Sequence, residues 1–305
     1  MEKAIRGKKL TSKEVARALG VSEASVKRWA DSGLLPMEKT AGGHRRFRPE
    51  DVALVRRAGV SEGESHALGK RSAAKLVARD AMGAELASGE EAALVEETFR
   101  ALLDGRDEEL SALLVNLHLH GLSVGAIADG FLCAAMRRVG DLWHAGRLSV
   151  AQEHVATRTA TSALQRFQGV LEAPARVGAR RALCCSVEDD FHDLPLRLAA
   201  LTLEECGLAV FNLGMSTPFS ALAEALERFR PDLVCVSSTV LVSLDRASRE
   251  YREFNKTARR VRATVVLGGA GFADAGVRER FPADFHAGSF RELEGFVRTP
   301  AADES

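Results

Sequence analysis

Two different hydrophobic periods divide this chain into segments. Between residues 91 and 175, apolar side chains recur every three to four positions, as they do at Leu110, Leu113, Leu114 and Leu117. This spacing places apolar residues on one face of a helix and predicts amphipathic helices. The segment is long enough for a bundle of four antiparallel helices.

From residue 178 to residue 305, the pattern changes to short apolar runs that alternate with helical stretches. Such runs predict strands buried on both faces of a parallel sheet, with helices as the connections. The predicted strands cover residues 182–187, 208–213, 233–237 and 264–267, with a further strand near His286, and the predicted helices cover residues 194–205, 220–229 and 244–260. We therefore expect an α/β flavodoxin-like (Rossmann-type) domain with a parallel five-stranded sheet, which binds ligands at the carboxyl ends of its strands.

Before residue 60, the pattern predicts two short helices. Thr11 and Glu14 form a capping box that opens a helix through Leu19, and Gly20 ends this helix. A second helix follows, to about Ser32. One small core would be shared by Val15, Ala16, Leu19, Val21, Val26 and Trp29. Two short helices around a tight glycine turn form a helix-turn-helix, which places its second helix in the major groove of DNA.

The charge distribution favours a polyanion as the partner of this N-terminal segment. Residues 1–60 hold 14 Lys and Arg against 7 Asp and Glu, a net of +7, whereas residues 61–305 hold 28 against 35, a net of −7. Gly42-Gly43 predicts a hairpin turn that raises a basic wing against phosphates. The candidate DNA contacts are Lys13, Ser25, Lys27, Arg28, His44, Arg45 and Arg46. A basic helical domain that binds protein is the alternative.

The segment from Thr11 to Phe47, which includes Trp29, Gly33-Leu34-Leu35-Pro36 and Gly42-Gly43, closely resembles the MerR-type winged helix-turn-helix. The resemblance implies an all-α winged helix-turn-helix head. It also implies sequence-specific binding to double-stranded operator DNA by a homo-oligomer, either a dimer or a tetramer. The predicted organisation is a head over residues 1–75, a linker over 76–90, a helical bundle over 91–175 and the sheet domain over 178–305.

One histidine stands out because of its place after the first predicted strand of the sheet. Asp190 and His192 lie in the loop that follows this strand, so both belong to the carboxyl edge where ligands bind. A histidine there can present one ring nitrogen to a metal while a carboxylate accepts a hydrogen bond from the other. Pro195 follows at the start of the next predicted helix, where proline is tolerated.

The Asp190-x-His192 pair resembles the core of the Asp-x-His-x-x-Gly motif of cobalamin-binding domains. The resemblance implies that His192 is the lower ligand of the cobalt. It also implies that the nucleotide tail of the cofactor meets the ends of later strands, where the glycines leave room for it, at Ser237, Thr239, Gly268 and Gly269. The chain departs from the motif at Pro195, which replaces the glycine and bears on the affinity and the identity of the cofactor.

A second pattern lies in the bundle, where Trp143 is followed after nine residues by Glu153 and His154. It resembles the Trp-x9-Glu-His pattern of light-sensing cobalamin repressors of the CarH/LitR family, in which the bundle caps the upper face of the cofactor. The resemblance implies that Trp143, Val150, Glu153 and His154 surround the upper ligand of adenosylcobalamin, with His144 as a second candidate cobalt ligand. An aromatic plane can exclude water from such a ligand, and a carboxylate can accept hydrogen bonds from it. Taken alone, the pattern also fits a core tryptophan and a helix-surface pair.

The combined resemblance predicts a light-responsive transcriptional regulator, a repressor, whose adenosylcobalamin state controls oligomerisation and operator binding. We expect no enzymatic activity. One alternative is a corrinoid methyl-carrier protein, which the DNA-binding segment argues against. The other is a regulator of the same architecture that binds another tetrapyrrole or works without a cofactor.

The cysteines and the hydropathy indicate the compartment. The five cysteines include no C-x-x-C pair, and Cys184, Cys185 and Cys235 lie in predicted strands, so we expect buried, reduced thiols. No apolar run approaches the ~20 residues of a membrane helix. The first residues also lack the apolar stretch of a signal peptide. These features predict a cytoplasmic protein without membrane contact.

Overall fold

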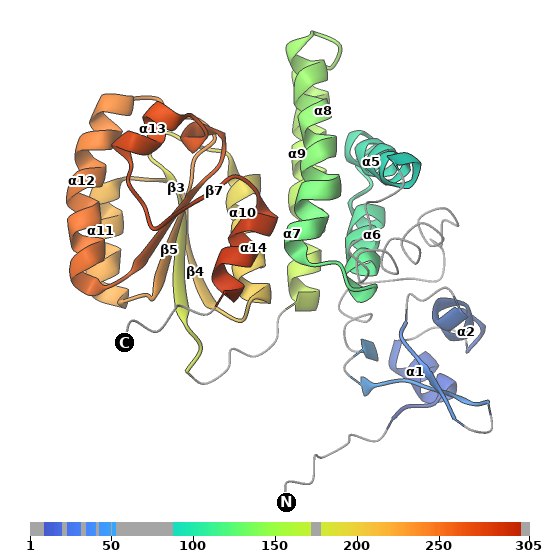
Figure 1. Ribbon diagram of the computed structural model, residues 1–305. Helices are drawn as coiled ribbons and strands as arrows, with labels where there is room; N and C mark the ends of the chain where they lie inside the picture. The colour runs from blue at the N-terminus through green and yellow to red at the C-terminus, as the bar shows by residue number, and fades with distance from the viewer. Residues whose placement is uncertain are drawn as a thin grey trace, which may run out of the picture. The chain divides into compact units, whose positions relative to one another are not determined.

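A computed structural model of the protein describes residues 9–19, 23–31, 35–40, 43–49, 51–52, 88–171 and 178–299. The chain forms two compact units. One unit spans residues 1–122 and 130–172, and the other spans residues 123–129 and 173–305 (Figure 1). The predicted linker over 76–90 lies almost entirely outside the described residues.

The N-terminal elements form a winged helix-turn-helix around one small core. They are two helices followed by two antiparallel strands, α1 (Ser12–Leu19), α2 (Glu23–Asp31), β1 (Glu38–Lys39) and β2 (Arg45–Arg46). The predicted capping box is confirmed, because Thr11 N donates to Glu14 Oε2 at 2.7 Å and Glu14 N donates to Thr11 Oγ1 at 3.3 Å. The buried core side chains are Val15, Ala16, Val26, Trp29, Ala30, Leu35, Phe47 and Val52, with Leu19 partly buried against them. Gly20 and Val21, predicted to end the first helix and to join the core, lie outside the described residues.

The other elements of this unit are helical, as the period of the hydrophobic positions predicts. The helices of the bundle are α5 (Ser88–Leu103), α6 (Asp107–Leu119), α8 (Cys133–His144) and α9 (Val150–Leu171). The apolar face of α6 is buried as predicted, at Leu110, Leu113, Leu114 and Leu117. Within the described ranges of both units, no helix combines the length and the hydropathy needed to span a bilayer.

Between α6 and α8, the chain passes through two short helical segments. The first is α7 (Val124–Ile127), which belongs to the second unit. The second is a π-helical turn, η1 (Ala128–Leu132), which leads directly into α8. The Ser123 side chain accepts a hydrogen bond from Ala126 N at 3.1 Å and so caps α7.

The second unit is built on a five-stranded parallel sheet (Figure 1). Its strands are β3 (Arg181–Val187), β4 (Ala209–Thr217), β5 (Leu233–Ser237), β6 (Thr264–Gly268) and β7 (Phe285–Ala287). Their spatial order, β4-β3-β5-β6-β7, confirms the expected flavodoxin-like topology. The predicted strand over 208–213 continues further than expected, to Thr217, past a positive φ of 92° at Gly214.

Helices cover both faces of this sheet, which explains its continuous apolar strands. One face carries α10 (Asp193–Glu205) and α14 (Phe290–Arg298), and the other carries α11 (Phe219–Phe229) and α12 (Leu244–Val261). After β6 come the short helices η2 (Ala270–Phe272) and α13 (Ala275–Arg280). Side chains of β3 alternate between the two faces, so Cys184 packs on the first face and Cys185 on the second.

The cysteines of the sheet are buried and reduced, as expected. Cys184, Cys185 and Cys235 are free thiols and at most 4% exposed. Burial raises the pKa of the Cys185 thiol, and a hydrogen bond with Cys235 together with burial raises the pKa of Cys184. Both thiols therefore stay protonated and unreactive near neutral pH.

Candidate functional site

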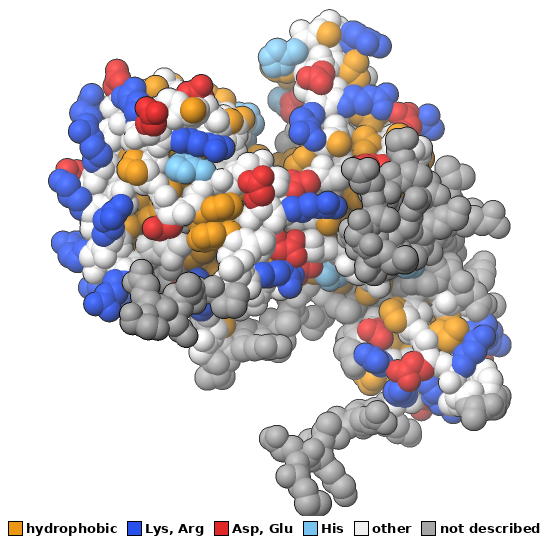
Figure 2. All heavy atoms as spheres, in the orientation of Figure 1, with side chains coloured by type: hydrophobic (Ala, Val, Ile, Leu, Met, Phe, Trp, Pro, Cys, Tyr) orange, Lys and Arg blue, Asp and Glu red, His pale blue; other side chains and the backbone are white. Residues whose placement is uncertain are grey.

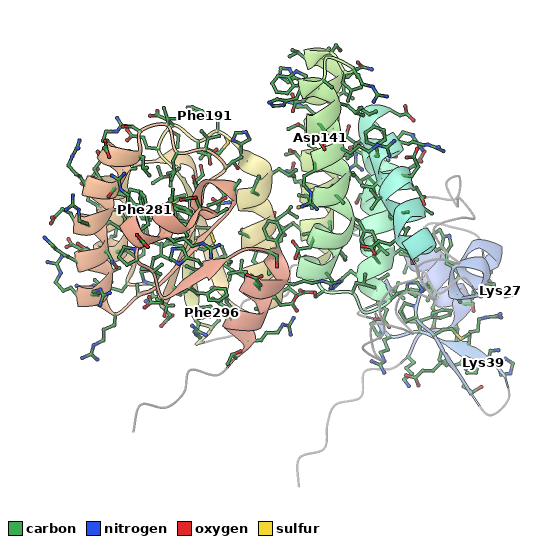
Figure 3. All side chains as sticks on the ribbon, turned by 45° about the horizontal axis from the view of Figure 1, so that its top comes forward. Lys27, Lys39, Asp141, Phe191, Phe281 and Phe296 are labelled. Carbon is green, nitrogen blue, oxygen red and sulfur yellow. The ribbon has the colours of Figure 1, made fainter. Side chains whose placement is uncertain are left out.

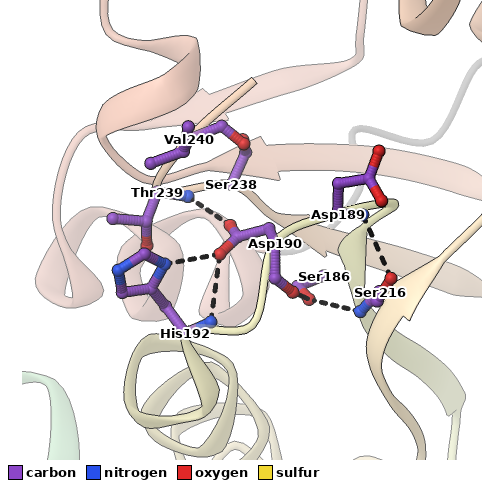
Figure 4. Close-up of polar contacts among 8 residues, drawn as sticks. All are labelled: Ser186, Asp189, Asp190, His192, Ser216, Ser238, Thr239 and Val240. Atoms are coloured by element: carbon purple, nitrogen blue, oxygen red, sulfur yellow. Dashed lines mark hydrogen bonds and ion pairs between the residues drawn. The ribbon is translucent and has the colours of Figure 1, made fainter. Parts of the chain in front are cut away.

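The loop between β3 and α10 places Asp190 and His192 side by side at the carboxyl edge of the sheet (Figure 4). His192 Nδ1 lies 2.7 Å from Asp190 Oδ1, and the main-chain N–H of His192 donates to the same oxygen at 3.0 Å. Because a carboxylate only accepts hydrogen bonds, Nδ1 carries the hydrogen, and in the neutral form of the ring the lone pair is on Nε2. The Asp190 side chain is 1% exposed, whereas that of His192 is 55% exposed. The buried carboxylate therefore orients a ring whose other nitrogen is available to bind a metal.

Asp190 also connects this loop to the end of the neighbouring strand, β5. Its second oxygen, Oδ2, accepts a hydrogen bond from the main-chain N–H of Thr239 at 2.6 Å. The buried carboxylate is thus satisfied by two main-chain N–H groups and one ring N–H. The sequence predicts Asp190 and Thr239 for the site, but only the structure reveals the hydrogen bond between them.

Further hydrogen bonds between this loop and β4 hold strained backbone in place. Asp189 and Ser216 have positive φ angles of 65° and 51°, a region that residues other than glycine seldom adopt. Asp189 N donates to Ser216 Oγ at 3.0 Å, and Ser216 N donates to Ser186 Oγ at 3.0 Å. Ser186 Oγ in turn donates to Asp190 O at 2.7 Å. These bonds fix the loop that orients His192, and strain of this kind often accumulates at functional sites.

Pro195, which stands where the cobalamin motif has glycine, fits the start of α10. It is the third residue of a helix that begins at Asp193. The N–H groups of a first helical turn have no acceptor within the helix, so the missing N–H costs no helical hydrogen bond. The contact between His192 and Asp190 forms with proline in place. Proline at this position is therefore compatible with the contact that orients the ring.

Exposed apolar side chains accompany the polar pair at this edge, and sequence reasoning missed them. Phe191 is 70% exposed, Val242 is 64% exposed and Val240 is 45% exposed. Figure 3 shows Phe191 projecting at the end of the sheet domain. Their only signal in the sequence was their position beside the predicted site residues. Large apolar side chains left in solvent commonly mark a binding surface, and these suit the face of a flat organic ligand.

The packing of the chain itself explains the two glycines at the end of β6. Gly269 has a φ of 98°, and a Cβ on it would lie 2.3 Å from Ser238 O. A Cβ on Gly268 would lie 3.3 Å from Ala287 O. Ser237, the last residue of β5, is buried and in register with Gly268. The main chain of Ser238 fills the space beside Gly269, because two backbones approach closely there. That these glycines also leave room for a nucleotide tail stays a prediction.

The five residues predicted for the upper side of the cofactor lie together at the turn between α8 and α9. The Trp143 ring is 4.9 Å from the His144 ring, in a T-shaped arrangement. Val150, the first residue of α9, is exposed, and Glu153 Oε2 lies 3.6 Å from His154 Nε2. Figure 2 shows histidine and hydrophobic side chains gathered at the end of this hairpin. Since Trp143 is 40% exposed, the interpretation as a core tryptophan is wrong.

The predicted DNA contacts lie on the two helices of the head and on the wing. Among those whose side chains are described, Lys13, Lys27 and His44 are exposed. Arg45 and Arg46 are half-buried. Ser25 and Arg28 lie in α2, but their side chains are outside the described residues. The predicted wing is confirmed as the β1–β2 hairpin, in which Gly43 has a φ of 76°. Figure 3 shows Lys27 and Lys39 projecting from the head, where cations can meet phosphates.

Three segments of the chain match known protein families. Residues 10–58 match a helix-turn-helix domain. Residues 94–167 and residues 180–293 each match a B12 binding domain. The matched segments correspond to the head, the helical bundle and the sheet domain of the structure.

Two known relatives span most of the chain. The HTH-type transcriptional repressor CarH of Myxococcus xanthus is 29% identical over 265 residues, which cover 83% of this chain and 84% of that protein. The HTH-type transcriptional repressor CarA of the same organism is 28% identical over 291 residues, which cover 92% of this chain and 91% of that protein. Among solved structures, the monomethylamine corrinoid protein of Methanosarcina barkeri has a TM-score of 0.57 at 19% identity. The match covers 67% of this chain and 97% of that one, and it shows a shared fold.

Proposed function

We propose that this chain, a cobalamin-binding transcriptional regulator, is a light-responsive repressor of the CarH type whose ligand is adenosylcobalamin. The observation that carries the proposal is the buried Asp190 carboxylate, which holds His192 Nδ1 at 2.7 Å and leaves the other ring nitrogen for cobalt. Phe191 and Val240 would contact the corrin ring beside it. When bound, adenosylcobalamin supplies a cobalt–carbon bond that light can break.

The residues at the α8–α9 turn would hold the upper side of this cofactor. Trp143 and Val150 offer exposed apolar surface that excludes water from the adenosyl group. Glu153 would accept hydrogen bonds from that group, and Thr157 Oγ1, which donates to Glu153 Oε1 at 2.7 Å, orients its carboxylate. We assign His144, whose ring contacts Trp143, as a second candidate cobalt ligand.

The state of the cofactor would control operator binding through the oligomeric state of the protein. A homo-oligomer, either a dimer or a tetramer, presents several heads to one operator, and linked heads raise the apparent affinity by ~10²–10⁴. A ligand shifts such an equilibrium only if it stabilises one assembly state more than the other. We propose that the cofactor-bound protein is the oligomer in the dark, and that its dissociation in light frees the operator.

Size-exclusion chromatography with absorbance detection tests this proposal. The full-length protein is loaded with adenosylcobalamin and run in the dark and after green illumination. We expect cobalamin to co-elute with an oligomer in the dark and with a smaller species after light. Absence of cobalamin from the protein peak would contradict the cofactor assignment. Co-elution at one unchanged size would contradict the light response.

Pro195 favours a second candidate function. A regulator of the same architecture could bind another tetrapyrrole or work without a cofactor, since proline replaces the motif glycine in this chain. The chromatography distinguishes this candidate, because such a protein would not retain adenosylcobalamin. A corrinoid methyl-carrier would retain it, but such a carrier has no use for a DNA-binding head.

Replacing Lys27 with alanine should weaken operator binding in a salt-dependent way. Lys27 is exposed on α2. Affinity falls with salt, and each phosphate contact that is lost makes the plot of log affinity against log salt less steep, by about 0.9 for each head. Fluorescence anisotropy over a range of salt concentrations measures this slope. Lys256→Ala is the matched control, because Lys256 is an exposed lysine of α12 that pairs with Glu253 at 2.9 Å. Equal slopes for both variants would show that Lys27 does not contact a DNA phosphate.

A further inference from the structure

One helical run leads from the sheet domain to the residues proposed for the upper side of the cofactor. It comprises α7, the π-helical turn η1 and α8, which follow one another from Val124 to His144 with no non-helical residue between them. At 1.5 Å per residue, the run is roughly 30 Å long. The boundary between the two units falls within it, after Asp129. Trp143 and His144 occupy its last two positions.

Asp129 binds the start of this run to α14 of the sheet domain. Its Oδ1 accepts a hydrogen bond from Phe290 N at 3.1 Å, and its Oδ2 accepts one from Arg291 N at 2.9 Å. The first N–H groups of a helix have no acceptor within it, and a negative charge near them is favourable. Asp129 therefore caps a helix that lies more than 160 residues further along the chain.

Two more contacts hold the same end of the run. Val124 N donates to Glu205 Oε2 at 2.9 Å, which ties α7 to the end of α10. A Cβ on Gly125 would lie 3.0 Å from the carbonyl carbon and oxygen of Phe290, so α7 and α14 approach each other closely. All the residues from Val124 to Ala128 are buried. The beginning of the run is thus part of the sheet domain in its packing as well as in its hydrogen bonds.

The π-helical turn lies directly after this anchored segment. Its residues, Ala128–Leu132, include Asp129 itself. π-Helical turns are rare and occur frequently at functional sites. They bend helices because one extra residue per turn interrupts the regular hydrogen-bond ladder. A helix anchored at one end and interrupted at that point will bend there more readily than along its regular part.

From these contacts, we propose that Asp129 is a positioning residue that fixes the base of a helical arm, so that Trp143 changes its position by bending of the arm at Ala128–Leu132. The segment Val124–Asp129 then stays docked on α10 and α14 in both states of the switch. This inference rests on the proposed function, since it concerns how the upper-side residues move.

Hydrogen exchange of the full-length, cofactor-free protein tests the anchor. The Asp129→Ala variant removes both hydrogen bonds to α14, and we expect amides 126–132 to exchange about tenfold faster, as for the loss of a helix cap. The matched control is Ser289→Ala, which removes the other cap of the same helix, a hydrogen bond from Glu292 N of 3.2 Å. We expect it to speed exchange in α14 and to leave amides 126–132 unchanged. If Asp129→Ala affected only α14, Asp129 would act as a cap of α14 alone and would not anchor the arm, and the proposal would be overturned.

A second measurement separates this proposal from the proposed function. In protein loaded with adenosylcobalamin, Asp129→Ala should keep the dark absorption spectrum, because it leaves His192 and Asp190 untouched. It should lose most of the light-induced change in size, because the arm is no longer fixed at its base. A complete size change in the variant would overturn the proposal. If the wild-type protein bound no cobalamin, the proposed function would fail, while the exchange comparison would still decide whether Asp129 anchors the arm.

Discussion

The His192→Ala variant should bind adenosylcobalamin at least ~10–100-fold more weakly than the wild-type protein, the loss already typical of removing an outer partner of a metal ligand. The absorption spectrum of any bound cobalamin should also change, because the cobalt loses its nitrogen ligand from the protein. Titration followed by absorbance measures both effects. An unchanged spectrum and affinity would contradict the assignment of His192 as the lower ligand.

The structure indicates that this variant will fold. The His192 ring is 55% exposed, so its removal leaves no buried cavity. Asp190 keeps its hydrogen bonds from the main-chain N–H groups of residue 192 and Thr239, so the buried carboxylate stays paired. The matched control is His120→Ala, which removes a half-buried histidine at the end of α6 whose Nδ1 lies 2.7 Å from Asn116 O. We expect it to bind the cofactor as the wild-type protein does.

The Gly269→Ala variant should destabilise the sheet domain by roughly 2–6 kcal/mol. Gly269 has φ 98° and ψ 172°, a region open almost only to glycine, and this strain costs of order 1–3 kcal/mol. The new Cβ would also lie 2.3 Å from Ser238 O, an overlap with main chain that adds about 1–3 kcal/mol. Urea unfolding followed by tyrosine fluorescence measures this loss, because the single tyrosine, Tyr251, is buried in the sheet domain.

Gly207→Ala separates strain from overlap. Gly207 also has a positive φ, of 87°, but a Cβ there would meet nothing within 4 Å. It should therefore cost only the backbone strain of about 1–2 kcal/mol. Gly269→Ala should in addition weaken cobalamin binding, since a shift of Ser238 moves the Thr239 N–H away from Asp190. Equal losses of stability in the two variants would show that the close approach to Ser238 does not matter.

The elements of the fold follow largely from local patterns in the sequence. The strand predicted over 233–237 is β5, with the same bounds, because a strand buried on both faces reads as one apolar run. The helix opened by the Thr11 and Glu14 capping box begins where predicted, because a cap depends on residues three positions apart. The strand β4 is longer than its hydropathy predicts, because its last residues are held by hydrogen bonds with the end of β3 and with the loop after it.

The candidate site is predictable residue by residue but not as an arrangement. The sequence determined that Asp190, His192 and Thr239 follow strands of a parallel sheet and so lie at one edge. Only the tertiary structure decided that the Asp190 carboxylate binds both the His192 ring and the loop after β5. It also decided that Phe191 remains in solvent, and that the main chain of Ser238 leaves no space for a Cβ at Gly269. The link from Asp129 to α14 likewise had no sequence signal. The physical reason is the range of the interactions: periodicity and capping act between near neighbours in the chain, whereas these contacts join residues that only folding brings together.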